Sequence, residues 1–302
     1  MAETALPVGR ARRPFLVRPL SDPAALRPYL EPQRAYAAFA LAHLAPRLFP
    51  LSRFFLSQGE GQDWGIVFYA RSGPGPSLLT IGEAAAVEAG LRLHPGPRYS
   101  FATCHPEHLE VLRRHFLLSR QRPMYRMSVS ADSFRPPPAP GPRWQVVRLR
   151  PREIGAVNRL YSAEGGTVAY PPRVLEEGVY YGAVADDRLV AIAGTHVVGP
   201  EVGIAVVGNV FTHPLWRGQG LATLVTAAVT RELLQRCPNV YLTVETENRP
   251  AVEVYRRLGY RVECTLYEMP ALRREPLGLL PLLRRAAARW RGRSLGVELV
   301  LL

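Results

Sequence analysis

The sequence has 302 residues, 47% of them hydrophobic and 21% charged, a composition typical of a folded globular chain rather than a disordered one. The net charge is +13, but all 38 basic residues are arginines and they are spread along the chain. This spread excludes a basic block that would predict specific nucleic-acid binding, although it would attract an anionic ligand. No apolar run reaches the ~18 residues that span a bilayer, and residues 1–20 hold no signal-peptide core.

The three cysteines, Cys104, Cys237 and Cys264, show neither a close pair nor a zinc-like spacing. A sparse, odd set of cysteines favours reduced thiols in a reducing compartment. We therefore expect a cytoplasmic protein, with no membrane partner and no specific nucleic-acid partner.

The N-terminal part of the chain alternates between helix-like and strand-like segments. We expect helices within 23–44, near 83–90 and from residue 106, and strands near 53–57, 64–70, 100–104 and 124–130. Cys104, His105, His108 and His115 gather here, but their spacing matches no usual zinc pattern. We expect surface histidines on a helix, and no metal site.

A proline-rich segment at 134–143 divides the chain. Prolines at this density disfavour helix and sheet and suit a semi-rigid, extended linker. The segment predicts an N-terminal domain at 1–133, a linker at 134–143, a second domain at 144–270 and a C-terminal extension at 271–302.

The second domain has a clear order of elements. The patterns predict strands at 144–149, 178–185, 188–198, 202–211, 240–245 and 260–269, and helices at 151–163, 221–236 and 249–258. This order indicates an α/β protein with a mixed sheet and helices on its faces.

A glycine-spaced loop, Arg217-Gly218-Gln219-Gly220-Leu221-Ala222, precedes the longest of these helices. Backbone N–H groups at a helix N-terminus bind anions, and glycines let a phosphate approach the backbone closely. The loop therefore predicts a phosphate site. It is not a Rossmann fingerprint, because the third glycine is missing, and it is not a P-loop, because the lysine is missing.

The segment Arg217-x-x-Gly220-x-Ala222 resembles motif A of the GNAT superfamily of acetyltransferases, and residues 208–214 are similar to its FR47-like branch. Residues 248–260, Asn-Arg-Pro-Ala-Val-Glu-Val-Tyr-Arg-Arg-Leu-Gly-Tyr, resemble motif B in the expected order. The resemblance covers about 144–269. It implies the GNAT acyl-CoA N-acyltransferase fold, acetyl-CoA as cosubstrate and no metal.

In the GNAT family the motif A strand splays from the next strand, and the pantetheine arm of coenzyme A lies in the gap, a form of strand addition. The resemblance implies that Val210 and Thr212 offer backbone groups to this arm and that Asn248 hydrogen-bonds it. The remaining residues that it implies for the cofactor are Asn209 and Phe211 on the strand, and Arg217, Gly218, Gln219, Gly220, Leu221 and Ala222 around the pyrophosphate.

Acetyl transfer to an amine requires a deprotonated amine, a polarised thioester and a proton for the leaving thiolate. The resemblance implies that Tyr255 is the acid; a packing role is its alternative. Glu245, at the end of a strand beside the cleft, is the first choice for the base. The other choices are His196, His213, for which we favour a structural role, and Glu201. No base is needed if the amine arrives neutral or if water relays the proton.

The family builds the acceptor side from the helix–loop region after the first strand, which is 161–170 here. Glu164, with Tyr161 and Tyr170, is expected to bind a cationic amine; an ordinary flexible loop is the alternative. We expect an enzyme that acetylates a primary amine of a small-molecule or amino-acid-like acceptor. A protein or peptide N-acetyltransferase and a non-catalytic acyl-CoA sensor are the competing hypotheses.

The two halves of the chain contain a short segment of similar sequence, called the echo below. Residues 110–116 resemble 253–260, which predicts two GNAT-like domains in tandem. Aligned by this echo, Asn248 corresponds to His105 and Tyr255 to Leu112, and the first half holds no Arg-x-x-Gly-x-Ala. We expect a degenerate N-terminal domain that binds no coenzyme A and shapes the acceptor cleft or a subunit interface.

The C-terminal extension contains an apolar stripe with helical spacing, made by Leu279, Leu282, Leu283, Ala286 and Trp290. Arginines lie beside it. We expect a helix that packs on the protein or on a second subunit in a homodimer; a helix on a membrane surface is the alternative. Residues 297–302 are expected to add a last strand.

Overall fold

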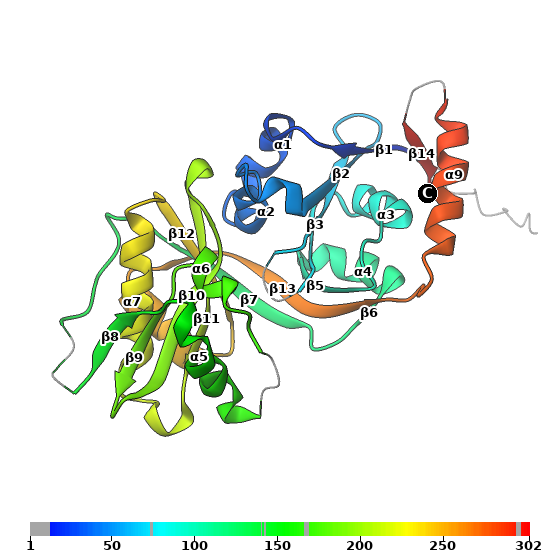
Figure 1. Cartoon of the computed structure of the whole chain (residues 1–302). Helices are drawn as coiled ribbons and strands as arrows, with labels where there is room; N and C mark the ends of the chain where they lie inside the picture. Colours follow the sequence, from blue (N-terminus) through cyan, green and yellow to red (C-terminus); the bar gives the residue numbers. More distant parts are fainter. Residues whose placement is uncertain (1–12, 73–74, 140, 142, 166–168, 294–296) are drawn as a thin grey trace, which may run out of the picture.

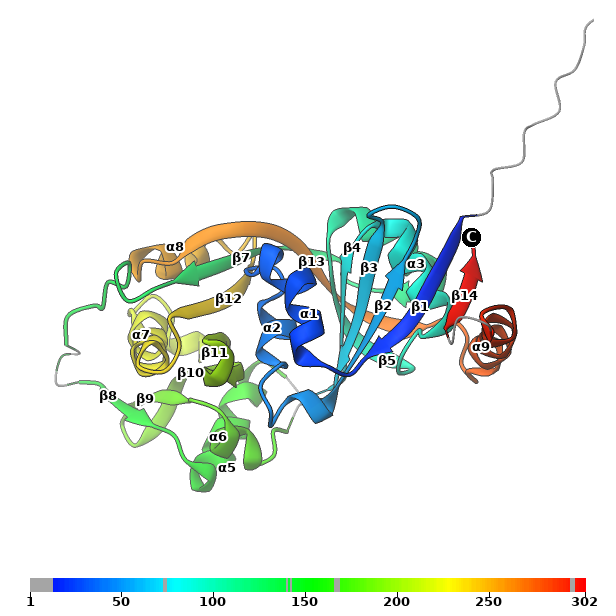
Figure 2. The same cartoon turned by 90° about the horizontal axis from the view of Figure 1, so that it is seen from above.

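The computed structural model describes residues 13–72, 75–139, 141, 143–165, 169–293 and 297–302. Its strands join in one continuous mixed sheet in the order β14-β1-β2-β3-β4-β5-β13-β7-β12-β11-β10-β9-β8, and β6 pairs with β13. Helices cover both faces of this sheet (Figures 1 and 2). The expected mixed α/β class is confirmed.

The N-terminal half of the molecule runs through β7. Its elements are β1 (Pro14–Leu20), α1 (Pro23–Leu30), α2 (Ala38–Ala42), β2 (Ser52–Gln58), β3 (Trp64–Ala70), β4 (Ser77–Gly82), α3 (Ala84–Leu93), β5 (Tyr99–Cys104), α4 (Leu109–His115), β6 (Phe116–Leu118) and β7 (Arg122–Val129).

The C-terminal half runs from β8 to β13, and a tail follows it. Their elements are β8 (Gln145–Arg148), α5 (Ile154–Tyr161), α6 (Arg173–Glu177), β9 (Tyr181–Ala185), β10 (Arg188–Gly199), β11 (Ile204–Thr212), α7 (Leu221–Leu234), β12 (Asn239–Glu245), α8 (Arg249–Arg257), β13 (Arg261–Arg273), α9 (Leu279–Arg291) and β14 (Glu298–Leu301).

The two halves repeat one topology. Each has a strand, two helices, an antiparallel meander of three strands, a helix, a strand parallel to the last meander strand, a further helix and a final long strand. The parallel pairs are β4 with β5 and β11 with β12. This repetition confirms the tandem arrangement that the echo between 110–116 and 253–260 predicts.

The halves exchange their final strands. β7, from the N-terminal half, pairs with β12 of the C-terminal half, and β13 pairs with both β7 and β5. Figures 1 and 2 show β13, in orange, running from one half of the molecule into the other. The sheet is therefore not divided at the proline-rich segment, and β13 extends past residue 270 to Arg273. Positions 140 and 142 of the predicted linker lie outside the described residues.

The core packs on both faces of the shared sheet. On one face α7 buries Leu221, Val225, Val229 and Leu233 against the strands of the C-terminal half. On the other face α2, from the N-terminal half, packs Leu41 and Ala42 against Val197 and Val206 of β10 and β11. An N-terminal helix thus covers part of the C-terminal sheet.

The C-terminal tail forms the two expected elements. β14 pairs with β1, and α9 contacts β14 and α3. However, α9 packs through Pro281 and Ala288, whereas the predicted apolar stripe is exposed. The helix therefore packs on the protein, as expected, but through the side opposite the predicted apolar stripe. Among the described residues, no helix is long and apolar enough to cross a membrane.

Candidate functional site

The strands β11 and β12 part in the middle of the C-terminal sheet. Their parallel pairing runs from Ile204 with Asn239 to Val207 with Leu242, and within the described chain it ends there. β11 continues to Thr212 on the edge of β10, and β12 continues to Glu245 on the edge of β7. Between the two continuations lies a stretch of sheet without paired neighbours, which is the splay that motif A predicts.

A β-bulge marks the point where the strands part. Between Ile192/Phe211 and Gly194/Gly208, β11 has one residue more than β10. Asn209 sits in this bulge with a φ of 55°. Its side chain donates to the Tyr180 hydroxyl at 2.9 Å, and its carbonyl accepts from the Tyr161 hydroxyl at 2.6 Å. These tyrosines hold the bulge in place, so Tyr161 has a positioning role.

The predicted phosphate loop lies at the open end of the splay. A short turn, Pro214–Trp216, leads into Gly218 and Gly220, which both adopt a φ of 76°, and α7 begins at Leu221. A β-carbon at either glycine would meet nothing within 4 Å, so the left-handed backbone is what requires glycine there. No side chain caps α7, and its first turn contains no acidic residue. The exposed N–H groups at the start of α7 are therefore suited to an anion.

Arg217 is paired across the loop. Its Nη2 lies 2.7 Å from Oε1 of Glu164, and its Nε donates to the carbonyl of Thr212 at 3.2 Å. Glu164 therefore faces the glycine loop, and it does not line the cavity described below. The expectation that Glu164 binds a cationic amine is not supported by this position. Residues 166–168 of the expected acceptor loop lie outside the described part of the chain.

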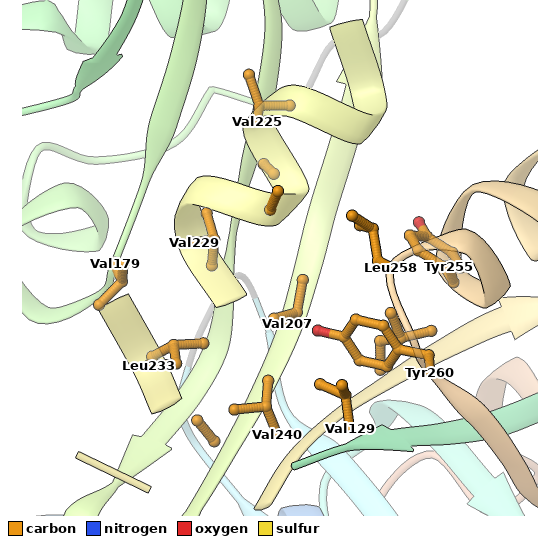
Figure 3. Packing of buried hydrophobic residues seen from close by; sticks show 14 of the residues in the cluster. Val129, Val179, Val207, Val225, Val229, Leu233, Val240, Tyr255, Leu258 and Tyr260 are labelled. Atoms are coloured by element: carbon orange, nitrogen blue, oxygen red, sulfur yellow. The ribbon is translucent and has the colours of Figure 1, made fainter. Parts of the chain in front are cut away.

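Tyr255 and Tyr260 lie in the core beneath α7, where Figure 3 shows them beside Leu258. The Tyr260 hydroxyl is bonded to Oγ1 of Thr230 at 2.8 Å. Tyr255 is 7% exposed, and its hydroxyl makes no hydrogen bond to any residue that the structure describes. Burial raises the pKa of Tyr255 to about 12, so its phenol stays protonated at neutral pH.

Two residues predicted near the cofactor make other contacts. Asn248 caps α8, with its Oδ1 accepting from the N–H of Ala251 at 3.2 Å, so only its amide NH2 is free to meet a ligand. Glu245 forms an ion pair with Arg122 of β7. Arg122 comes from the exchanged strand, and no sequence pattern predicts that this strand lies beside Glu245. The contact makes Glu245 a poor choice for a proton acceptor.

A cavity of about 240 Å³ lies on the sheet face opposite α7, between the two halves. Its C-terminal wall includes Tyr170, Tyr180, His196 and Asn209, so it reaches the bulge. Its N-terminal wall is formed by residues after α2 and at the end of β3. Of the predicted acceptor residues, only Tyr170 lines this cavity.

Arginines dominate the charge of this cavity. Arg47, Arg71 and Arg173 line it, against one carboxylate, Glu177. Arg47 donates to the carbonyl of Val198 at 2.7 Å, and none of the three arginines forms an ion pair with a residue that the structure describes. The cavity therefore offers guanidinium groups to an anion.

His196 occupies a second bulge, in β10, next to the cavity. A β-carbon at Gly208 would lie 2.0 Å from its Nε2, so the ring lies against the β11 backbone just before Asn209. Although the side chain is exposed to the cavity, the protein packed around it, with a smaller effect from the Arg126 guanidinium, lowers its pKa, which keeps the imidazole neutral. Of the other predicted bases, His213 accepts from the N–H of Leu215 and Glu201 lies in a separate turn, Pro200–Val202.

A polar group that the sequence did not predict lies on the same sheet face. Arg126 of β7 is 2% exposed and donates to Oγ1 of Thr243 at 2.7 Å, while its Nε has no partner among the described residues. Burial raises the pKa of Glu268 on β13, and Arg126 and Thr243 partly offset this. In the sequence, the one sign of this polar group is a charged residue within an otherwise apolar strand. Arg126 and Glu268 come to lie beside the splay because β7 and β13 are exchanged between the halves.

The N-terminal half has no equivalent of the phosphate loop. Only Glu83 separates β4 from α3, so no glycine loop is present and a carboxylate stands where an anion would bind. Leu112, which corresponds to Tyr255, is fully buried. His105 and His108 are bonded to Gln33 and Thr80, respectively. Within the described ranges, no group of three or more His, Cys, Asp or Glu side chains is arranged to hold a metal ion.

Known proteins resemble the chain in sequence and in fold. Residues 155–260 match the model of the acetyltransferase (GNAT) family. Mycothiol acetyltransferases from two Mycobacterium strains, JLS and MCS, are 37% identical over 84 residues, which cover 26% of this chain and 27% of theirs. The chain therefore matches about a quarter of the length of these curated relatives.

Solved structures match a larger part of the chain. A Drosophila protein matches with a TM-score of 0.65 at 17% identity, covering 86% of this chain and 99% of its own. A GCN5-related N-acetyltransferase from Sphaerobacter thermophilus matches with a TM-score of 0.52 at 16% identity, covering 85% and 95%. At these identities the likeness shows the fold alone.

A parallel strand pair splays beside a glycine loop and an uncapped helix N-terminus, within a sheet of mixed α/β class. The family match makes this more specific. The chain carries a GNAT acetyltransferase-family domain in its C-terminal half, and the fold of that family extends over most of the chain.

Proposed function

We propose that the C-terminal half transfers an acetyl group from acetyl-CoA to the primary amine of a small acceptor. The observation that carries this proposal is the splay between β11 and β12, with the loop at Arg217 to Ala222 at its open end. The pantetheine arm would pair with the backbone from Asn209 to Thr212, and the pyrophosphate would meet the N–H groups at the start of α7. The Asn248 amide would complete the binding of the arm.

The chemistry follows from which groups hold protons. The amine attacks the thioester carbon, the carbonyl becomes a tetrahedral oxyanion, and its collapse expels the thiolate of coenzyme A. Tyr255, protonated because its pKa is raised, would give the thiolate its proton. His196, neutral and against Gly208, replaces Glu245 as our choice for the group that takes the amine proton, directly or through water.

The acceptor would enter the cavity between the halves. A volume of about 240 Å³ admits a small molecule or one side chain of a larger acceptor. Arg47, Arg71 and Arg173 line this cavity, so the acceptor would carry a carboxylate or another anionic group in addition to its amine. The sensor hypothesis is disfavoured because both the loop and Tyr255 are intact.

A thiol-release assay with paired acceptors tests this proposal. Each pair would be an amino acid and its amide, which share the amine and differ in the carboxylate. We expect the double variant R71Q/R173Q to raise KM for the acid by about tenfold per arginine, because each lost charge-assisted hydrogen bond is worth about 1.5 kcal/mol or more. KM for the amide should change little.

Arg231→Gln is the matched control, because Arg231 is exposed on α7, on the other face of the sheet. It removes one positive charge without touching the cavity. Equal KM values for acid and amide in the wild-type protein would contradict an anionic acceptor. If no amine in a broad panel released thiol, acetyl transfer to small amines would itself be wrong.

A further inference from the structure

The helix α9 lies at the edge of the molecule, at the end opposite α7 and α8 (Figures 1 and 2). It packs on β14 and α3 through Pro281 and Ala288, which are two helical turns apart on one side. The opposite side of the helix faces away from the protein.

This outward side is apolar. Leu279 is 56% exposed, Leu283 66% and Trp290 77%, and spacings of four and seven residues place all three on one line along the helix. Leu280 and Leu282 flank this line and are also exposed. Monomeric proteins seldom leave such a row of large apolar side chains in contact with water, so the row indicates a binding surface.

Arginines flank the apolar row on both sides. At 100° per residue, Arg284 and Arg291 fall on one side of the row and Arg289 falls on the other, whereas Arg285 is half-buried near the packed side of the helix. Arg289 pairs with Glu298 of β14, whereas Arg284 and Arg291 form no ion pair with any described residue. The helix itself contains no acidic residue. An apolar row with arginines at its borders suits the boundary between the acyl chains and the headgroups of a lipid layer.

We propose that α9 binds the surface of an anionic membrane. The helix would lie parallel to the surface, with Leu279, Leu283 and Trp290 inserted below the headgroups and the arginines against lipid phosphates. This is peripheral binding by one face of a helix, and it does not rest on the proposed acetyl transfer. It departs from the expectation of no membrane partner.

Charge favours a lipid over a second copy of the chain as the occupant of this surface. A twofold contact through α9 would bring the same face of two molecules together. It would place the arginines of one helix beside those of the other without an acidic residue on either helix to pair them. The net charge of +13 adds to that repulsion. Anionic lipid, in contrast, would attract both the arginines of α9 and the positively charged protein as a whole.

Vesicle sedimentation with the full chain tests the proposal. The probes are vesicles of equal parts phosphatidylglycerol and phosphatidylcholine, and vesicles of phosphatidylcholine alone. We expect binding to the anionic vesicles that weakens as salt is raised. Leu283→Asp should reduce the partition coefficient by roughly tenfold or more, because the leucine side chain that would be inserted in the membrane is lost. R284Q/R291Q should reduce it by about fivefold per arginine.

Val262→Asp is the matched control. Val262 is an exposed apolar residue of β13, 40% accessible, in the C-terminal half. It introduces the same charge away from α9, so it should leave vesicle binding within about twofold of wild type. A thermal melt of each variant excludes misfolding, and the exposure of Leu283 predicts an unchanged melting temperature. The fluorescence of Trp290, taken as wild type minus Trp290→Phe, should shift to the blue on the anionic vesicles.

Three results would overturn the proposal. The first is no sedimentation with anionic vesicles at low salt. The second is equal loss of binding in Leu283→Asp and Val262→Asp. The third is a concentration-dependent dimer that Leu283→Asp abolishes while vesicles bind neither protein, which would assign the row to a second copy.

Discussion

Two neighbouring tyrosines differ in the one property that acid catalysis needs. Tyr260 and Tyr255 are both buried, and their ring centroids lie 6.0 Å apart. The Tyr260 hydroxyl is engaged with Thr230, whereas the Tyr255 hydroxyl has no partner among the described residues. A free, protonated phenol can serve as a donor, and an engaged one is a structural element.

The substitution Tyr255→Phe should lower kcat by about 10²-fold or more, because the leaving thiolate loses its proton donor. The affinity for acetyl-CoA should stay within about twofold, since the ring and its packing remain. A thiol-release assay measures kcat, and titration calorimetry measures the affinity for acetyl-CoA.

Tyr260→Phe is the matched control for this prediction. It removes the hydrogen bond to Thr230 and should cost about 1 kcal/mol of unfolding free energy without the same loss in kcat. If Tyr255→Phe kept full activity, the acid would have to be another group.

Local geometry could be predicted from the sequence where it depends on a local motif, as at the two glycines of the loop and at Asn248, which caps α8. The roles of Asn248 and Tyr255 toward coenzyme A stay predictions. The contacts of Glu245 and Glu164 could not be predicted, because their partners, Arg122 and Arg217, come from a distant strand and a separate loop. The side chains of Arg126 and Glu268 meet the site only through long-range pairing, which a single sequence does not reveal.

At the scale of elements, an ion pair in the loop before α7 competes with the proposed ligand. The Glu164 carboxylate is paired with the Arg217 guanidinium, so an incoming pyrophosphate would have to displace that carboxylate. The pair is half-exposed, and exposed ion pairs contribute at most about 1 kcal/mol. The competition is therefore modest and can be measured.

Opposite changes in affinity should follow from the two ends of this pair. Arg217→Gln should weaken acetyl-CoA binding by about fivefold, and Glu164→Gln should strengthen it by about twofold to fivefold, because it releases the guanidinium. Titration calorimetry at low salt measures both. A loss of affinity in Glu164→Gln would show that Glu164 contributes to the ligand site instead of opposing it.

Periodicity predicted the longer elements well and the short ones poorly. The expected helix 221–236 is α7, and the expected strand at 64–70 is β3. The strands β1 and β4 and the helix α6 were not predicted. β1 contains two prolines, which disfavour a strand, and the five residues of α6 are too few for its pattern to repeat. Their conformations are set by the pairing and packing of neighbouring elements.

At the scale of the whole molecule, the exchange of β7 and β13 makes each half incomplete without the other. Removing the N-terminal half would strip β12 of its neighbour β7 and remove α2 from the C-terminal sheet. It would also remove Arg47 and Arg71 from the acceptor cavity. The N-terminal half therefore completes the sheet and one wall of the cavity that we propose for the acceptor.

Both halves share one sheet, and we propose that coenzyme A binds in a single cleft of that sheet. Calorimetric melting of the full chain with and without acetyl-CoA tests both points most directly. We expect a single unfolding transition that rises as a whole by about 5 °C when acetyl-CoA is present at 100 times its Kd. The absence of any shift, or two transitions of which acetyl-CoA moves only one, would contradict them.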